Sequence, residues 1–109
     1  MNITIRNYKD EDFPAMEQLL KARGIPYEPS QKRDSLKRKL AYDPDSVMVA
    51  EAHTRLLGTV VLTYHPEQCS IHDLAIHPAY NGAGLEKRLL DEAIKRIKAK
   101  HLLWIAKMR

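Results

Sequence analysis

The stretch that decides the fold is IHDLAIHPAYNGAGLEKRLL, residues 71–90. It begins with an apolar run typical of a buried strand and ends with leucines at the spacing of an amphipathic helix. Between them lies a short turn rich in glycine, which lets main-chain N–H groups approach a ligand closely. Because these N–H groups and the start of a helix surround one concave spot, the stretch predicts a phosphate-binding turn.

The rest of the chain reads as short elements separated by turn residues. Acidic residues and Pro14 favour a helix start near Asp10, and Gly24 is a helix stop. The turn His53-Thr54-Arg55 is short enough for a hairpin. The expected elements are strands at 3–8, 46–52, 56–64, 69–77 and 101–106, and helices that begin near Asp10, Ser30 and Leu85.

This order, β-α-α-β-β-β-α-β, predicts an α/β domain. We expect a mixed sheet of about five strands flanked by about three helices. The three middle strands form an antiparallel meander, and the strand–helix–strand unit at the end makes a parallel pair. The strand at 69–77 is apolar on both faces around Leu74, Ala75 and Ile76, which favours a central place in the sheet.

Composition limits the class of protein. A chain of 109 residues fits one domain, and no apolar run approaches the ~20 residues of a membrane helix. The first residues alternate like a strand and predict no secretory leader. A single cysteine, Cys69, excludes an internal disulfide and favours the cytoplasm.

The charge pattern favours an anionic ligand. The net charge is +4, yet aromatic residues make up only 6% of the chain, too few for an obvious base-stacking surface, so nucleic acid is an unlikely partner. The second helix carries a basic face, for which a solvated surface and a binding patch both remain open. That face consists of Lys32, Arg33, Lys37, Arg38 and Lys39.

With its strand, turn and helix in this order, the chain resembles the GNAT acetyltransferase superfamily from residue 3 to residue 106. The resemblance implies one acyl-CoA-binding domain over residues 1–109, without the family's C-terminal β-hairpin region. Acetyl-CoA or CoA would lie between the strands at 69–77 and 101–106. The pantetheine arm would pair with the main chain of Leu74, Ala75 and Ile76.

The resemblance also assigns the phosphate turn. The family pattern is Arg/Gln-x-x-Gly-x-Gly/Ala, and the cofactor-binding residues matched to it here are Asn81, Gly82, Ala83, Gly84 and Leu85. Asn81 replaces the usual Arg or Gln and brings no charge. Glu86 replaces a small residue, so its carboxylate either repels the pyrophosphate or points outward and favours the helix N-terminus.

Acyl transfer to an amine needs a base, an oxyanion donor and an acid. A main-chain N–H within 74–76 matches the family's oxyanion donor. The glutamate that serves as base in some members falls near Ser70, so His72 and Asp73 are the candidate catalytic residues. Packing of His72 within the sheet is the alternative. Tyr64 and Tyr80 are candidate acids or packing residues.

These features predict an N-acetyltransferase that moves an acetyl group from acetyl-CoA to a primary amine of a small molecule or peptide. The alternative is a non-catalytic module of the same fold that binds CoA or a protein partner. Histidine spacing predicts no metal site. An open edge at 102–106 favours cover by a second copy of the chain, as a homodimer.

Overall fold

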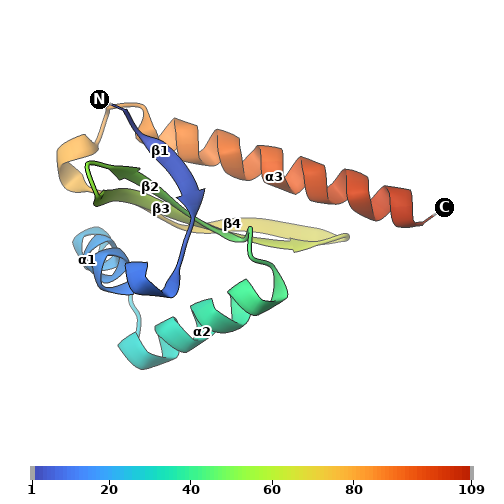
Figure 1. Cartoon of the computed structure of the whole chain (residues 1–109), viewed down its shortest axis with the longest axis horizontal. Helices are drawn as coiled ribbons and strands as arrows, with labels where there is room; N and C mark the ends of the chain where they lie inside the picture. Colours follow the sequence, from blue (N-terminus) through green and yellow to red (C-terminus); the bar gives the residue numbers. More distant parts are fainter. Residues whose placement is uncertain (1, 109) are drawn as a thin grey trace.

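A computed structural model describes residues 2–108. Within these residues there are three helices and four strands, with two short 3₁₀ turns (Figure 1). In chain order they are β1 (Thr4–Asn7), η1 (Asp10–Asp12), α1 (Phe13–Arg23), α2 (Pro29–Tyr42), β2 (Val47–Ala52), β3 (Arg55–His65), β4 (Gln68–Ile76), η2 (Pro78–Tyr80) and α3 (Leu85–Lys107).

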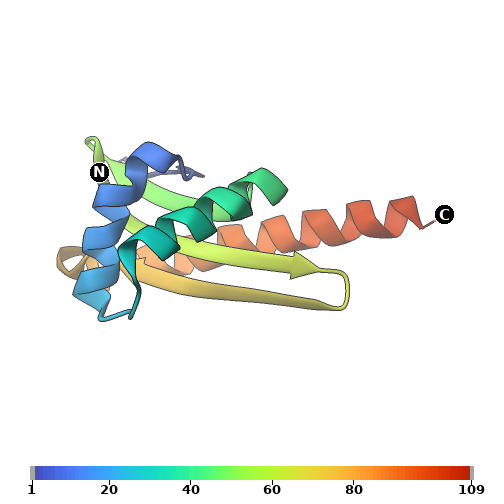
Figure 2. The same ribbon diagram turned by 90° about the horizontal axis from the view of Figure 1, so that it is seen from below.

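The four strands form one antiparallel sheet in the order β1-β2-β3-β4. Helices α1 and α2 cover one face and α3 crosses the other (Figure 1), and Figure 2 shows α3 running behind the long β3–β4 hairpin and past its tip. The hairpin predicted at residues 53–55 is present. His53 and Thr54 adopt positive φ angles of 52° and 63° there, which suits the twist of a two-residue turn.

Strand alternation divides the core between the two faces. Successive side chains of β3 point to opposite sides, so Val61 packs under α1 and α2 while Val60 and Leu62 pack under α3. The α3 layer depends on the lack of a side chain at Gly58. A Cβ built there would lie 2.9 Å from both Ile76 Cδ1 and Leu89 Cδ1.

Residues next to the helix ends determine where α1 stops and where α2 begins. Gly24 ends α1 with φ of 74°, as predicted. Glu28, not Ser30, caps α2, because Pro29 occupies the first helical position and the Glu28 carboxylate accepts from Gln31 N at 2.8 Å. None of the helices in residues 2–108 is both long and apolar enough to cross a membrane.

The strand predicted at 101–106 is wrong, because these residues continue α3 to Lys107. No glycine or proline follows Gly84, so nothing in the sequence ends the helix. The described sheet is therefore antiparallel with four strands, not mixed with five, and the order is β-α-α-β-β-β-α. The strand expected at its centre, β4, lies at its edge.

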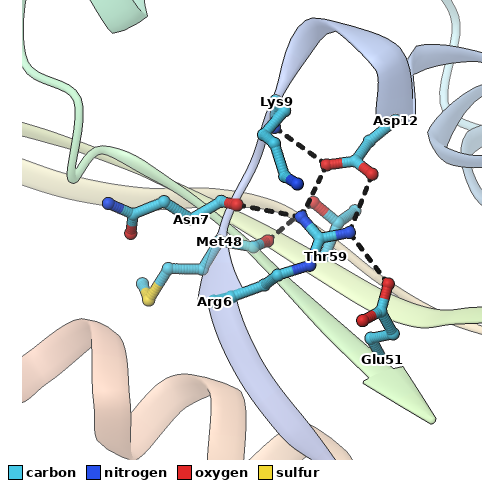
Figure 3. Close-up of polar contacts among 7 residues, drawn as sticks. All are labelled: Arg6, Asn7, Lys9, Asp12, Met48, Glu51 and Thr59. Carbon is cyan, nitrogen blue, oxygen red and sulfur yellow. Dashed lines mark hydrogen bonds and ion pairs between the residues drawn. The ribbon is translucent and has the colours of Figure 1, made fainter. Parts of the chain in front are cut away.

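Arg6 joins β1 to the start of α1 and to β2 (Figure 3). Its guanidinium donates to both Asp12 carboxylate oxygens at 2.8 Å and to Glu51 Oε2 at 2.9 Å. Burial alone would raise the pKa of Asp12, but hydrogen bonds from Arg6 and the Lys9 main chain hold that pKa below its ordinary value. This ion pair fixes the N-terminal strand against the helix that follows it.

Candidate functional site

The site begins at an irregularity in β4. Thr59 is opposite Ala75 and Val61 is opposite His72, so Val60 faces the two residues Asp73 and Leu74. This is a β-bulge, and Asp73 takes φ of 53°, a left-handed conformation that aspartate tolerates better than most residues. The bulge bends the strand at the start of the segment predicted to pair with pantetheine.

The outer edge of β4 carries no paired strand within residues 2–108. The N–H of His77 donates to Leu57 O at 2.7 Å, so the main chain of His77 points toward β3. Because hydrogen-bonded and open positions alternate along an antiparallel pair, Ala75 also faces β3, whereas Ile76 faces the open edge. Leu74 belongs to the bulge, where this alternation is interrupted. Of the three predicted residues, Ile76 therefore presents its main-chain donor and acceptor to a ligand along that edge.

The glycine-rich turn lies between η2 and α3, as predicted. Gly82 and Gly84 have φ of 83° and 80°, and a Cβ at either would meet nothing within 4 Å. Glycine is therefore required at these two positions because of the backbone conformation and not because of a lack of space. Gly84 precedes Leu85 at the start of α3, and no side chain caps this helix, so the N–H groups of its first turn remain available to an anion.

The turn opens into a groove of about 550 Å³. Its lining brings together residues of β4, the turn and the first turns of α3: Ile76, Tyr80, Asn81, Gly82, Gly84, Glu86, Lys87, Leu90, Asp91 and Ile94. Lys87 places a positive charge where Asn81 offers none, but its Nζ donates to Asp91 Oδ2 at 2.6 Å. Glu86 is also among the residues that line the groove in which the pyrophosphate is expected.

His72 lies in a chain of polar contacts on the α2 face of the sheet. Lys39 Nζ donates to Thr63 Oγ1 at 2.7 Å, and Thr63 Oγ1 lies 3.2 Å from His72 Nε2. His72 Nδ1 is 3.7 Å from Asp73 Oδ2, and Asp73 also pairs with Lys32. The structure thus brings the two predicted catalytic residues together and adds Lys32, Lys39 and Thr63.

The surroundings of His72 favour its neutral form, chiefly through burial. Burial lowers its pKa, Asp73 opposes this effect, and Lys39 and Lys32 add to it. Because Lys39 can only donate, Thr63 accepts from it, and we assign the Thr63 hydroxyl hydrogen to Nε2. The ring hydrogen is then on Nδ1, toward Asp73. A neutral imidazole of this kind has a basic nitrogen at physiological pH.

The other candidate residues lie apart from this cluster. Tyr64 points to the α3 face, where its hydroxyl lies 3.1 Å from His101 Nδ1. Tyr80 lines the groove of the turn, and its ring packs edge-on to His77. Cys69 is exposed, not buried as free cysteines usually are. Among residues 2–108, no group of three or more His, Cys, Asp or Glu side chains could hold a metal ion.

Sequence reasoning missed the parts of the cluster that lie outside β4. Thr63 is two residues after Val61, so strand alternation puts it on the same face, opposite Ser70. Lys32 and Lys39 were seen only as members of a basic helix face. Their roles depend on how α2 crosses the sheet, which no local pattern reports.

Comparison with known proteins places this geometry in a family. Residues 7–108 match the model of the Acetyltransferase (GNAT) family. A relative from Pectobacterium atrosepticum named as an acetyltransferase is 28% identical over 96 residues, which cover 88% of this chain and 68% of the relative.

Two solved structures have a similar fold. Ard1 from Thermoplasma volcanium superposes with a TM-score of 0.79 at 17% identity, over 93% of this chain and 67% of that one. PaiA N-acetyltransferase from Thermoplasma acidophilum, solved in complex with coenzyme A, gives 0.73 at 22% identity, over 92% of this chain and 74% of that one. These relatives contain residues beyond those matched here.

Proposed function

The chain belongs to the Acetyltransferase (GNAT) family, and on that premise we propose which residues carry an acetyl group from acetyl-CoA to a primary amine. The family match confirms the resemblance seen in the sequence and the class of reaction. Acetyl-CoA is the acetyl donor. We propose that residues 1–109 act as one acyl-CoA-binding domain, with the cofactor along the open edge of β4.

The turn and the strand hold different parts of the cofactor. The N–H groups of Gly82, Ala83, Gly84 and Leu85, with the Asn81 amide, receive the pyrophosphate at the start of α3. The edge-facing main chain of Ile76 pairs with the pantetheine arm together with the main chain of Leu74 at the bulge, and Ala75 keeps that segment in the sheet. The single observation that carries this proposal is that the open edge of β4 is followed, after η2 and the glycine-rich turn, by an uncapped helix N-terminus.

His72 acts as the general base and Asp73 positions it. His72 Nε2 takes up a proton that the Thr63 hydroxyl relays from the acceptor's ammonium group, and the freed nitrogen lone pair attacks the thioester carbonyl carbon. The oxyanion is held by a main-chain N–H on the edge of β4. The C–S bond then breaks while the C–N bond remains. The nitrogen, positively charged after the attack, gives up a second proton, and the departing CoA thiolate takes up a proton from a tyrosine that this second proton restores. Tyr80, which lines the same groove, is the nearer of the two tyrosines to supply it.

We further propose a homodimer located in the cytoplasm. The sequence suggested that the dimer would form along a strand edge at 102–106, but these residues are helical. The dimer is supported instead by the exposed apolar side chains at the end of α3. Leu102, Leu103 and Met108 are 67%, 64% and 65% exposed, and the neighbouring edge of β4 is open. Large exposed apolar surfaces mark interaction sites. Analytical ultracentrifugation should find a dimer that Leu103→Glu dissociates.

A non-catalytic CoA-binding module is the second candidate. The observation that favours it is the pair of carboxylates, Glu86 and Asp91, in the groove beside the phosphate turn. They would weaken binding of a pyrophosphate and leave the cofactor poorly held for transfer.

Calorimetry with CoA and a thiol-release assay with a panel of primary amines test the proposal. Gly84→Asp should abolish most CoA binding. Gly24→Asp is the matched control, because Gly24 has φ of 74°, ends a helix and also has open space around it. Equal CoA affinity in the two variants would contradict the phosphate site. His72→Ala should lower turnover with little change in CoA affinity, and vigorous turnover in that variant would refute the role of His72 as general base.

A further inference from the structure

Lys39 is a partly buried cation whose hydrogen-bond partner is neutral. Its Nζ donates to Thr63 Oγ1 at 2.7 Å, and no carboxylate in residues 2–108 forms an ion pair with it. Other cations of α2 are paired, Lys32 with Asp73 and Arg33 with Asp10. A lysine ammonium has three donors, so two of those on Lys39 have no assigned acceptor.

The nearest acidic neighbour is already occupied. Asp43 lies at the end of α2, and its carboxylate oxygen is 2.6 Å from Lys100 Nζ on the opposite helix. Burial lowers the pKa of Lys39, and Asp43 only partly opposes that effect. Taking a cation out of water is unfavourable unless an anion compensates it. An anionic group brought by a ligand would meet this need.

A cavity lies beside this ammonium group. It has a volume of about 390 Å³, which falls within the usual range for small-molecule sites. It lies between α2 and β3, and its lining includes Arg38, Lys39 and Thr63. Asp43 also lines it, but the charge of that carboxylate is balanced by Lys100. Arg38 is exposed and adds a second positive charge at the same opening. The cavity is separate from the groove at the glycine-rich turn.

The cavity is next to the proposed base. Lys39 Nζ and His72 Nε2 both contact the Thr63 hydroxyl, at 2.7 and 3.2 Å, so they lie within about 6 Å of each other. A small molecule with an anionic group on Lys39 would therefore bring a nearby amine to His72 and to the edge of β4. That edge is where the acetyl donor is proposed to lie.

We infer that the acceptor is a primary amine that also carries a carboxylate, which Lys39 binds together with Arg38. This inference rests on the proposed function, because it names the acceptor of that reaction. The carboxylate accepts from Lys39 donors that have no other assigned acceptor, and the amine end faces His72. A small amino-acid-like acceptor meets both requirements.

The test compares two acceptors that differ only in charge, 4-aminobutyrate and 4-aminobutyramide. Three methylene groups separate amine from carbonyl, so the two amines have similar basicity. The carboxylate form should show the lower KM. Lys39→Met should raise KM for 4-aminobutyrate by about 10- to 100-fold relative to KM for 4-aminobutyramide, and any change in kcat through the Thr63–His72 contact should be the same for both acceptors. Lys37→Met, on the same helix but outside the cavity, is the matched control.

A binding measurement separates this inference from catalysis. Titration with butyrate, which has no amine to react, should shift the NMR amide signals of Lys39 and Thr63, and butyramide should not. If no amine is acetylated, the proposed catalysis fails and the butyrate titration alone decides this inference. If both acceptors are acetylated equally in the unmodified protein, the carboxylate site is refuted and the proposed function stands. Lys39→Arg, which keeps the charge, should retain the preference should Lys39→Met prove unstable.

Discussion

Gly58→Ala should destabilise the protein, because the packing of α3 on the sheet leaves no room for a methyl group. The added Cβ would lie 2.9 Å from Ile76 Cδ1 and from Leu89 Cδ1, and 3.3 Å from the Ala75 carbonyl oxygen. The first two neighbours are ends of side chains and can shift, whereas the third is main chain. The affected residues connect β3, the edge of β4 and α3, which frame the proposed cofactor site.

The expected size follows from two opposing effects. Overpacking a core costs about 1–3 kcal/mol. Alanine also restricts the unfolded chain more than glycine does, which stabilises by about 0.4–1 kcal/mol where the backbone is compatible. We therefore expect a net loss of about 1–2 kcal/mol. The clash can be relieved in part by Ile76→Val, which removes the Cδ1 atom and alone costs about 0.5–1.5 kcal/mol.

A double-mutant cycle tests this reasoning. Urea unfolding, followed by circular dichroism, measures the free energy of unfolding of the parent protein, the two single variants and the double variant. If the clash with Ile76 is real, the double variant should be more stable than the sum of the two single effects predicts. A Gly58→Ala protein as stable as the parent, with additive effects in the cycle, would refute the packing argument. CoA calorimetry on the folded variant then reports whether the displacement reaches β4.

Three further predictions follow from charged groups. Glu86→Gln should tighten CoA binding about two- to fivefold at low salt and lose that gain at high salt; Glu67→Gln is the control, and an unchanged affinity would mean that the carboxylate faces away. Arg6→Met should cost about 1–3 kcal/mol in urea unfolding, because it leaves the Asp12 carboxylate, only 12% exposed, without its bidentate partner. Burial lowers the pKa of His72 below its ordinary value of 6.5, so stability should fall as pH drops beneath that value, where protonation favours the unfolded chain. His72→Asn should reduce the decrease of Tm with falling pH below 6.5. An unchanged dependence of Tm on pH would contradict the assignment of a lowered pKa to His72.

Much of the candidate site could be predicted because it is local in sequence. The strand, turn and helix over residues 71–90 carry their own signals: an apolar run, glycines at 82 and 84, and leucines at helical spacing. Each acts over a few residues, so no knowledge of the rest of the chain is needed. The cluster around His72 was only half predicted, since Thr63 and Lys39 reach it from other elements.

The error at residues 101–106 shows where local reasoning ends. The run from His101 to Ala106 is apolar enough for a strand, yet it follows residues 85–100, most of them good helix formers, without a stop signal. A short apolar run does not distinguish strand from helix, and continuation of an existing helix adds a hydrogen bond for each residue. Because residues 101–106 are helical, they do not pair with β4, and β4 lies at the edge of the described sheet.

The sequence by itself determined the order of the elements through α3, the positive-φ glycine turn and the family to which the chain belongs, because hydrophobic period and glycine placement are properties of neighbouring residues. Only the tertiary structure decided that β4 has an open edge, that α3 continues to Lys107, and that Lys39, Thr63 and His72 meet. These features depend on which strand pairs with which and on how α2 crosses the sheet. Such choices are set by long-range packing, which minimises exposed apolar surface over the whole chain.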